Sequence, residues 1–453
     1  MTVSFQTSDI GDPGPYPAFV DARGPAGVGD VQNVAKAIAE AKRIVVVCGA
    51  GVSVAAGIPD FRSSEGLFRT LKAGNPKELL TSGKDLFDAS VFNTPQTTSL
   101  FYKMIAELSS MSSTAHPTAF HEFVKLLDDR GQLLRLYTQN IDNIEEKVGL
   151  SCGVPHWETQ KRSHSSPTKT PKKQPPPATS PFVSPTPSVQ SENLSDSGTA
   201  TNESPTPTPT PAPAEPQCVI PPRCIPLHGT LKYLTCRRCS HHMPLQEHVG
   251  ILRQGASIAC PQCAALNSVR RMVGKRDRGV GTMRPSVVLY GEVHQDGEGV
   301  GECVRRDLLG LGDSSTPRAK SSAKPDLLIV AGSSLKVPGT RRIVREFAKA
   351  VQANRSSSRQ SDKFSAHSPR NSPSSRSSHP RTVRAGNKDP DQHPATIYLN
   401  LDFPLPSREW DGVFDVWLQG DVQSVIPHFV EALHQKDAEK VTGSSRKRRK
   451  APD

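Results

Sequence analysis

The sequence predicts an α/β fold built on a largely parallel sheet, and three observations lead to that prediction. Short runs of β-branched and apolar residues alternate with stretches of helical periodicity, which is typical of parallel sheets flanked by helices. One run, residues 44–51, ends in glycines, as a buried strand does where it meets a phosphate-binding turn. Four cysteines form two Cys-x-x-Cys pairs, while two segments rich in proline and serine interrupt the pattern. We therefore predict a Rossmann-like parallel-sheet domain with a small inserted zinc-binding module and long disordered insertions.

The predicted elements follow one another along the chain with clear changes of pattern. Apolar periodicity predicts an amphipathic helix over residues 30–43, which leads into the strand at 44–51. Residues 85–150 have a mostly helical pattern that contains a second buried strand at 133–140. A repeated Pro-Thr stretch at 205–213 favours extended chain and cannot bury a core. Folding signals resume at 224–231, and we expect further hydrophobic strands at 286–292, 326–335 and 396–402 and a closing helix at 422–436.

Composition indicates that the chain is not one continuous core. Hydrophobic residues make up 35% of 453 residues, below the roughly 45–50% of globular chains, and there are 41 prolines. The formal net charge of +12 favours anionic partners such as DNA, RNA or the chromatin surface, although the charge can equally lie on disordered tails. No apolar run reaches about 18 residues, and the first residues lack a basic segment followed by an apolar one. We expect neither a membrane span nor a secretory signal.

The four paired cysteines predict a structural zinc site. Cys236, Cys239, Cys260 and Cys263 follow the pattern C-x2-C-x20-C-x2-C, which suits four thiolates around a tetrahedral ion. Four protein ligands leave no open position for a reacting water, so the ion is expected to be structural. With few apolar residues between the pairs, the module is expected to need metal in order to fold. A redox dithiol pair or an iron–sulfur cluster is the alternative, and such a ribbon in isolation could also be a nucleic-acid module.

The glycine-rich segment GAGVSVAAGIPDFRS, residues 49–63, predicts a dinucleotide site. Glycines allow the backbone to approach a pyrophosphate, and free amides at the start of the next helix would face the anion. The usual fingerprint requires a third glycine where this chain has Val54, which disfavours an ordinary dehydrogenase. An acid, an aromatic ring and a cation follow in one turn (Asp60, Phe61 and Arg62), a combination that a purely structural loop rarely needs.

Several motifs together resemble those of the sirtuin family. Besides GAGVSVAAGIPDFRS, the chain carries TQNID at 138–142, HG at 228–229, the two Cys-x-x-Cys pairs, VVLYGE at 287–292, GSSLKVPG at 332–339 and NLD at 400–402, in the family order. The LYGE form and the long Pro/Ser insertion look similar to a fungal nuclear subgroup that acts on a lysine in the globular part of histone. The resemblance implies NAD-dependent removal of an acyl group from lysine, giving nicotinamide, free lysine and O-acyl-ADP-ribose. No Tyr-x-x-Arg pair occurs in the GLFRT segment, so acetyl is the default acyl group.

The resemblance also assigns the site residues. It makes His228 and Asn140 catalytic, with His228 as the general base that activates a ribose hydroxyl, because an unperturbed pKa near 6.5 suits that role at neutral pH. It places at the NAD site Gly49, Ala50, Gly51, Ser53, Asp60, Phe61, Arg62, Gln139, Asn140, Ile141, Asp142, Gly332, Ser333, Ser334, Asn400 and Asp421. It places along the acyl-lysine peptide Val288, Tyr290, Gly291 and Glu292.

Plainer interpretations of the same residues remain open from the sequence alone. A histidine in Leu-His-Gly is more often structural than catalytic, and TQNID is also a typical helix N-cap. VVLY is also a typical core strand. For the whole chain, the alternatives are a chromatin-binding scaffold with incidental catalysis and an NAD-dependent protein mono-ADP-ribosyltransferase.

These predictions divide the chain into nine segments and place it in the nucleus. The basic cluster SSRKRRK, residues 444–450, suits nuclear import, with a solvated tail as the alternative. The expected partners are acetylated histone, or another acetyl-lysine protein, and chromatin. The segments are a flexible N-terminus (1–30), the Rossmann-like domain in three parts (31–158, 283–355 and 395–436), disordered insertions (159–219 and 356–394), the catalytic-histidine segment (220–231), the zinc-binding module (232–282) and a basic C-terminal tail (437–453).

Overall fold

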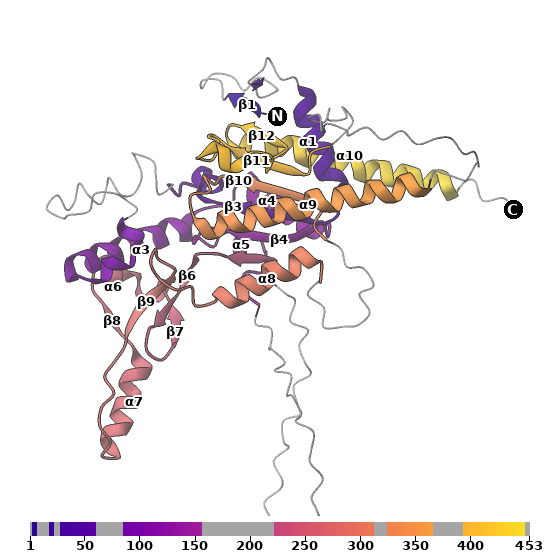
Figure 1. Ribbon diagram of the computed structural model, residues 1–453. Coiled ribbons are helices and arrows are strands. Elements are labelled where there is room, and N and C mark those ends of the chain that lie inside the picture. Colours follow the sequence, from indigo (N-terminus) through magenta and orange to yellow (C-terminus); the bar gives the residue numbers. More distant parts are fainter. Residues whose placement is uncertain are drawn as a thin grey trace, which may run out of the picture. The chain divides into compact units, whose positions relative to one another are not determined.

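The computed structural model describes residues 2–6, 18–21, 28–59, 85–155, 222–311, 324–365 and 393–448 (Figure 1). The insertion predicted at 159–219 lies outside these residues, and so do Asp60, Phe61 and Arg62. No helix in the described part of the chain is long and apolar enough to cross a bilayer.

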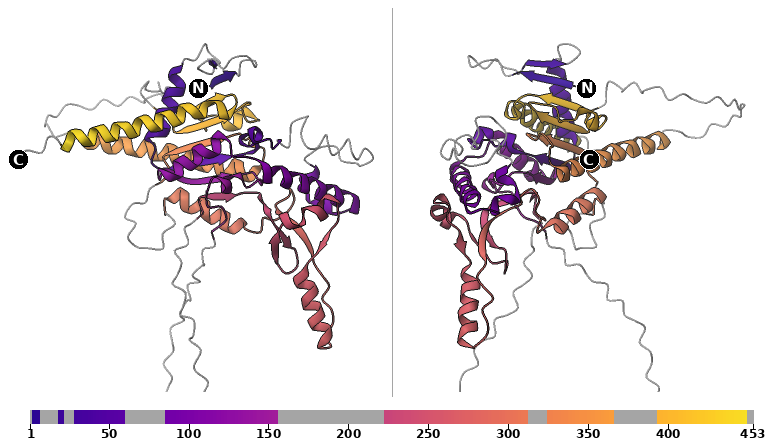
Figure 2. Two further views of the ribbon diagram at one scale, coloured as in Figure 1. Left: turned by 180° about the vertical axis from the view of Figure 1, so that it is seen from behind. Right: turned by 60° about the vertical axis from the view of Figure 1, so that its left-hand side comes forward.

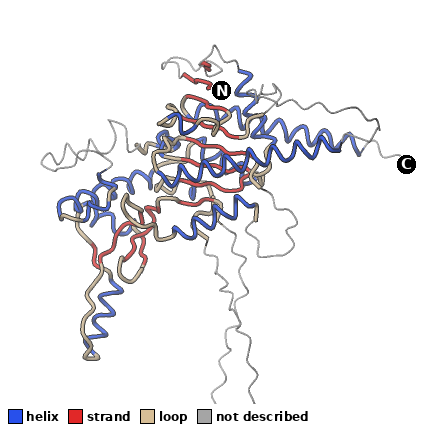
Figure 3. The backbone as a smooth tube through the Cα atoms, in the orientation of Figure 1, coloured by secondary structure: helices blue, strands red, loops and turns tan. Residues whose placement is uncertain are grey.

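The strands of the larger sheet lie side by side between helices (Figure 3), in the order of a doubly wound α/β fold. Six strands paired in parallel run in the order β5-β4-β3-β10-β11-β12, which is order 3-2-1-4-5-6 among these six along the chain. The order reverses between β3 and β10, so the crevice outside the carboxyl ends of these two strands is where a ligand is expected. The six strands are β3 (Ile44–Cys48), β4 (Leu133–Thr138), β5 (Cys224–Pro226), β10 (Leu327–Ala331), β11 (Thr396–Asn400) and β12 (Val416–Gln419).

Two further strands extend this sheet at the β12 edge. β1 (Thr2–Gln6) pairs in parallel with β12, and β2 (Ala18–Asp21) pairs antiparallel with β1. We predicted a flexible segment for residues 1–30, and that prediction did not include these strands. Their backbone partners belong to β12, more than 400 residues away along the chain, and no local pattern reveals such a pairing.

Helices cover both faces of the parallel sheet (Figures 1 and 2). On one face α1 (Val28–Glu40), α4 (Ala119–Asp129) and α10 (Val422–Arg448) pack together, and Phe123 lies 5.8 Å from Phe429, ring centre to ring centre. On the other face α8 (Gly297–Leu309) and α9 (Pro338–Ser365) pack, and the Phe347 ring lies 5.5 Å from that of Tyr137 in β4. β3, β4 and β10 are buried along their whole length. Each fully buried large apolar side chain contributes about 1.5–3 kcal/mol.

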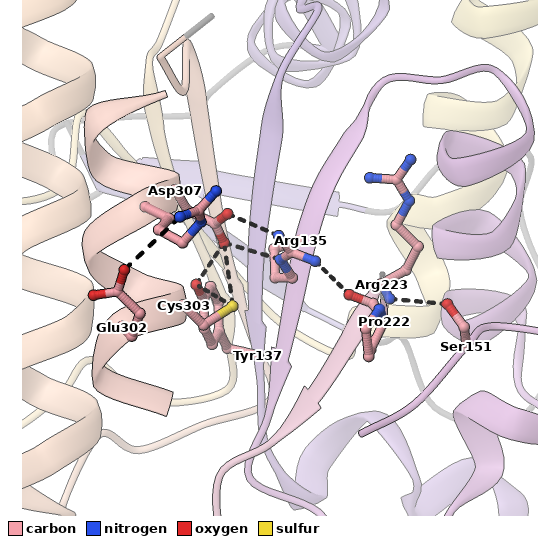
Figure 4. A network of polar contacts seen from close by, with 9 residues as sticks. Arg135, Tyr137, Ser151, Pro222, Arg223, Glu302, Cys303 and Asp307 are labelled. Carbon is pink, nitrogen blue, oxygen red and sulfur yellow. Dashed lines mark hydrogen bonds and ion pairs between the residues drawn. The ribbon is translucent and has the colours of Figure 1, made fainter. Parts of the chain in front are cut away.

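A buried polar network joins β4 to α8 (Figure 4). The Arg135 guanidinium donates from Nε and Nη2 to the two carboxylate oxygens of Asp307, at 3.0 and 2.9 Å. The Tyr137 hydroxyl donates to the same carboxylate at 2.6 Å, and Arg135 also donates to the backbone carbonyl of Pro222. Arg135 and Asp307 are 1% and 2% exposed, so each charge depends on the other for its stability in this core. The network also fixes Pro222, the first described residue after the insertion.

The second sheet is small and antiparallel, in the order β7-β6-β9-β8. Its strands are β6 (Gly229–Cys236), β7 (His242–Pro244), β8 (Ile258–Ala259) and β9 (Thr282–Val287). We predicted a hydrophobic strand at 286–292 within the parallel sheet. The strand instead ends at Val287 and lies in the small sheet, because its side chains alternate between buried and exposed, which suits a sheet with one solvated face.

The small sheet shares an apolar cluster with α3 (Pro95–Thr114). Phe101, Ile105 and Leu108 of α3 are buried in the same cluster as Leu234 of β6 and Leu252 of α6 (Val249–Arg253). The cluster also contains Cys236, Cys260 and Cys263, and Cys239 packs against it. The zinc-binding module therefore rests on a helix that precedes it by more than a hundred residues. The remaining short elements are η1 (Ala50–Val52), η2 (Val54–Ala56), η3 (Asp85–Phe87), η4 (Ala89–Phe92), α5 (Ile144–Lys147), η5 (Gln246–His248), α7 (Pro261–Met272) and η6 (Ser407–Trp410).

Two helices extend beyond the domain boundaries that we predicted. α9 continues to Ser365, beyond the predicted start of an insertion at 356, and α10 continues to Arg448, within the predicted tail. Once a helix is nucleated, each added residue gains one hydrogen bond for one residue fixed, so polar sequence can continue it.

Candidate functional site

At the switch point of the sheet, the loops after β3 and β10 contact each other through glycine backbones. Gly49 donates its amide to the Ala331 carbonyl at 3.1 Å, and Gly51 donates to the Gly332 carbonyl at 2.9 Å. A Cβ on Gly51 would lie 2.8 Å from Gly332 Cα, and Gly332 itself has φ of +59°. These glycines are therefore required for close approach of the β3 and β10 loops, in addition to any approach to a ligand.

The helix expected after the glycine turn is short within the described residues. Two single turns of 3-10 helix, η1 and η2, occupy residues 50–56, and Gly57 ends them with φ of +82°. The Gly51 amide donates to the Gly332 carbonyl, so it is not one of the free amides that we expected to face an anion. Hydroxyl groups at the end of β10 supply polar atoms there: Ser333 is buried, and the Ser334 Oγ is buried with no hydrogen-bond partner among the described residues.

Gln139 connects three strand ends at the crevice. Its side-chain amide donates to the Cys48 carbonyl at 3.1 Å and to the Ser333 hydroxyl at 2.7 Å. Its backbone amide donates to the same Cys48 carbonyl at 3.0 Å. Gln139 therefore holds the ends of β3, β4 and β10 in register, a structural role alongside the predicted contact with a ribose.

Ser53, Asn140 and Asp142 meet at one end of this crevice. The Asn140 amide donates to Ser53 Oγ at 3.1 Å, and Ser53 also hydrogen-bonds the Asp142 carboxyl. Burial raises the pKa of Asp142, and the Ser53 and Ile144 hydrogen bonds oppose that rise. Asp142 accepts the Ile144 amide at 3.2 Å at the start of α5. The N-cap of α5 is Asn143, one residue after TQNID, and its side chain makes no capping hydrogen bond.

A small pocket lies beside these three polar side chains. Its other walls are apolar and include Ile141, which is 6% exposed. A few polar groups among apolar walls are typical of small-molecule sites. The pocket is lined by Ala50, Ser53, Ile58, Pro59, Leu108, Asn140, Ile141, Asp142 and Leu231. A larger hollow between α4 and α10 contains none of the predicted site residues.

A buried acid below the crevice was missed by the sequence analysis. Glu145 is 3% exposed, and burial, followed by the charge of Asp142, raises its pKa to about 8. The Cys48 thiol lies 3.3 Å from Thr138 Oγ1 and 4.0 Å from a Glu145 carboxyl oxygen. At neutral pH Glu145 is therefore mainly protonated and can share hydrogen bonds at the carboxyl ends of β3 and β4. Its place in α5, a four-residue helix, gave no pattern from which to predict this.

His228, the predicted base, has one of its two ring nitrogens in a hydrogen bond. Its Nδ1 lies 3.0 Å from the Gln139 carbonyl oxygen, which can only accept, so Nδ1 carries the proton and Nε2 keeps a free lone pair. Burial lowers the pKa of His228, the Gln139 carbonyl opposes that change, and nearby His294 lowers the pKa further. The imidazole is therefore neutral at physiological pH, the form that a general base requires.

Gly229 allows His228 to lie where β6 meets β9. It has φ of +82°, and a Cβ there would lie 2.1 Å from the Ser286 carbonyl oxygen. The amide of Val288 donates to the His228 carbonyl at 2.9 Å, so β9 fixes the histidine backbone. The Leu-His-Gly motif thus has both a structural and a chemical explanation.

The segment predicted to line the acylated peptide is already partly engaged. Tyr290 donates its amide to the Phe87 carbonyl at 2.7 Å and its carbonyl accepts the Ala89 amide at 2.9 Å, so its backbone groups are already hydrogen-bonded within the chain. Glu292 forms ion pairs with Arg237 and Arg284, at 3.4 and 3.7 Å. Val288 is half-buried, Gly291 has φ of +80°, and the Tyr290 side chain is 37% exposed.

Asn400 and Asp421 lie at the carboxyl ends of β11 and β12. The Asn400 amide donates to the Tyr398 hydroxyl and to the Asp402 carbonyl, both at 3.0 Å. Asp421 is exposed and accepts the Gln423 amide at 3.2 Å, which makes it a cap for α10. Their predicted contacts with an adenosine stay predictions.

The four paired cysteines have the geometry of a zinc site. Their sulfur atoms all lie within 4.8 Å of one another, and Sγ–Sγ distances are 3.8 Å for Cys236–Cys263 and 3.6 Å for Cys239–Cys260. Zinc–sulfur bonds of about 2.3 Å in a tetrahedron place sulfur atoms about 3.8 Å apart. Backbone amides of Arg238 and Cys263 point to the sulfurs of Cys236 and Cys260 at 3.4 and 3.5 Å, as suits thiolates. The residues fit a structural zinc ion.

Comparisons with known proteins agree with this geometry. The model of the Sir2 family matches residues 49–160 and 220–339, just over half of the chain. The chain is 36% identical to "NAD-dependent protein deacetylase hst4" of Schizosaccharomyces pombe over 323 residues, 71% of this chain and 60% of that protein. It is 34% identical to "NAD-dependent histone deacetylase HST4" of Saccharomyces cerevisiae over 333 residues, 72% of this chain and 68% of that protein.

The chain spans only part of some of these relatives. For "NAD-dependent histone deacetylase HST3" of Saccharomyces cerevisiae, identity is 32% over 325 residues, which cover 71% of this chain and 58% of that protein. Among solved structures, one described as "Structural Basis for the Mechanism and Regulation of Sir2 Enzymes" has 18% identity and a TM-score of 0.47, and the match covers 90% of this chain and 98% of that chain. At that score the likeness adds nothing to the sheet order described above.

Proposed function

This chain belongs to the Sir2 family, and on that premise we propose that it is an NAD-dependent protein-lysine deacetylase. Its substrate is acetylated histone in chromatin, where it acts in silencing and genome stability. The products are nicotinamide, deacetylated lysine and O-acetyl-ADP-ribose. The names of the two Saccharomyces cerevisiae relatives support the histone substrate, and the basic cluster at 444–450 supports the nuclear location.

The observation that carries the proposal is the hydrogen bond from His228 Nδ1 to the Gln139 carbonyl. Gln139 directly precedes Asn140 in the chain, so this hydrogen bond holds the imidazole of the predicted base next to the backbone that carries Asn140. Because Nδ1 is occupied, Nε2 is the atom that can take a proton from a sugar hydroxyl. The lowered pKa of His228 keeps that atom unprotonated at neutral pH.

The polar groups of the crevice fit the dinucleotide in this scheme. Bound NAD supplies an electrophilic ribose carbon with nicotinamide as its leaving group. Ser53, Asn140 and Asp142 offer hydrogen bonds to a carboxamide at one end. The buried, unpartnered Ser334 hydroxyl fits a phosphate oxygen. We assign Asp60, Phe61 and Arg62 to the same site from the sequence alone.

One assay tests the proposal. The full-length chain is incubated with an acetylated histone peptide, with and without NAD, and the mass of both the peptide and the nucleotide product is measured. We expect NAD-dependent loss of the acetyl group and formation of O-acetyl-ADP-ribose. Addition of ADP-ribose to protein would instead indicate a transferase, and binding of the peptide without turnover would indicate a scaffold.

A substitution of His228 tests its role. Removal of the base in His228→Ala is expected to lower kcat about 10²–10⁴-fold, with zinc content and thermal midpoint unchanged. His434→Ala, at an exposed histidine of α10, is the matched control and should keep full activity. Loss of activity that accompanies unfolding in His228→Ala would contradict a catalytic role.

A further inference from the structure

The small sheet carries a projecting element that the proposed function does not use. α7 and the segment that returns from it to β9, residues 261–281, extend away from the strands of the small sheet in each view (Figures 1 and 2). We call this element the α7 arm. From 261 to 280, only Cys263 and Asn267 are buried.

Hydrogen bonds along its length organise the arm. Lys275 donates its amide to the Arg270 carbonyl at 2.8 Å, and Arg270 Nε donates to the Arg276 carbonyl at 2.8 Å. The Arg278 amide donates at 3.0 Å to Oδ1 of Asn267, which is 4% exposed. The return segment is thus held against α7, and a partner that binds the arm has little ordering entropy to overcome.

One side of the arm is apolar and faces solvent. Leu266, Val269, Met272 and Val273 are 53%, 52%, 78% and 60% exposed. Spacings of three and four residues place these side chains on one helix face, away from the face that Cys263 and Asn267 bury. Contiguous exposed apolar side chains of this kind mark interaction sites on soluble proteins.

The arm is also strongly basic. It contains five cations and one acid, and Asp277 is paired with Arg271 at 2.7 Å. Lys275, Arg276 and Arg278 are exposed and form no ion pair with any other described residue. The free charges therefore lie next to the apolar face, where an acidic partner would complement them.

We propose that the α7 arm is a docking surface for an acidic protein surface that contains an apolar groove. An amphipathic helix recognises a protein by laying its apolar side chains in such a groove, while basic neighbours select acidic rims. Nucleic acid is the less suitable partner, because the arm has no aromatic residue to stack on bases and its exposed apolar side chains gain nothing from phosphates.

The arm and the catalytic histidine lie at opposite ends of one strand. β6 begins at Gly229, beside His228, and ends at Cys236, a zinc ligand of the module that carries the arm. Docking at the arm would therefore increase the affinity for a large acylated assembly without altering the reacting groups. This consequence rests on the proposed function, whereas the docking surface itself does not.

The experiment compares two substrates with three variants of the full-length chain. The substrates are a short acetylated histone peptide and reconstituted nucleosome core particles with the same acetyl-lysine, since core particles expose both histone surface and DNA. The charge variant is Lys275→Glu/Arg276→Glu/Arg278→Glu, and the stripe variant is Leu266→Ser/Val269→Ser/Met272→Ser. The control variant Lys36→Glu/Lys349→Glu/Arg408→Glu makes the same charge change at exposed positions outside the arm.

We expect the charge and stripe variants to lower kcat/KM on core particles about tenfold, as for loss of a few interface anchors, with peptide turnover unchanged. The control variant should behave as the native chain. Equal kcat/KM for all variants on core particles would overturn the proposal. So would a loss confined to the charge variant and matched by a loss of binding to free duplex DNA, since that result assigns the arm to nucleic acid.

Binding measurements distinguish failure of the docking proposal from failure of the proposed function. If the native chain deacetylates neither substrate, the proposed function fails, and fluorescence anisotropy with labelled core particles still decides the role of the arm. Weaker binding by both arm variants supports the docking surface, and unchanged binding refutes it. Zinc content and thermal midpoint confirm that each variant is folded.

Discussion

The parallel sheet and the zinc-binding module reach stability by different means. The parallel sheet buries a large apolar cluster from β3, β4, β10, β11 and three helices, without any metal ligand among its described residues. The small sheet has a smaller cluster that consists of α3, short strands and four cysteines. A cluster of this size needs a further stabilising interaction, which zinc can supply. The predicted site residues come from both regions: Ser53 and Asn140 lie in the first, and His228 lies at the border with the second.

Zinc removal should have the largest effect on stability, and that effect should be confined to the zinc-binding module. Zinc binding in isolated zinc peptides contributes about 10–16 kcal/mol, so chelation or Cys260→Ser/Cys263→Ser is expected to unfold the module. Hydrogen exchange read by mass spectrometry should show lost protection in β6–β9 and retained protection in β3, β4 and β10. Cys303→Ser, at a buried cysteine of α8 outside the cluster, is the control for zinc content. Retained protection of β6–β9 after chelation would show that packing on α3 keeps the module folded without zinc.

A change in the buried ion pair should have the next largest effect, on the parallel-sheet side. Asp307→Ala leaves the Arg135 charge without its partner in a core where it is 1% exposed. Breaking one partner of a buried pair costs about 3–5 kcal/mol, which urea unfolding would detect. Glu302→Ala, in the exposed pair with Arg305 on the same helix, should change stability little. Equal midpoints for the two variants would contradict the argument.

A substitution at the border between the sheets should have an intermediate effect. Gly229→Ala adds a Cβ that lies 2.1 Å from the Ser286 carbonyl oxygen at φ of +82°. A strained backbone conformation alone costs about 1–3 kcal/mol, and displacement of β9 adds to it. Gly57→Ala isolates the conformational cost, because Gly57 has the same φ of +82° and no atom within 4 Å of the new Cβ. Thermal unfolding should show a larger loss for Gly229→Ala, and a smaller loss would exclude the contact with Ser286.

The smallest expected effect concerns the pH dependence of His228. Burial first, and the neighbouring His294 last, lower its pKa below the ordinary value of 6.5. The acid limb of the kcat/KM profile, where a base becomes protonated, should therefore lie below pH 6.5. Because His294 lowers that pKa, His294→Gln should move the limb to higher pH. A limb that stays in place would show that the two imidazoles do not interact.

The sequence by itself determined the zinc ligands, the glycine turn and the candidate base. Each is a local pattern: two Cys-x-x-Cys pairs, a β-branched run that ends in glycines, and a histidine followed by glycine. The parallel strands at 44–51, 133–140, 326–335 and 396–402 were likewise predictable, and the structure shortens each by a few residues. A strand that is buried on both faces consists almost entirely of apolar residues, so it can be recognised in the sequence as a continuous apolar run.

Only the tertiary structure decided which distant residues share a contact. The pairing of β1 with β12, the Arg135–Asp307 ion pair and the nearness of His294 to His228 join residues without a common local pattern. The same holds for the hydrogen bonds of Gln139, which we had assigned to a ribose and which also bridge β3 and β10. Periodicity reports which face of an element is buried, whereas the partner on that face depends on how the whole chain packs.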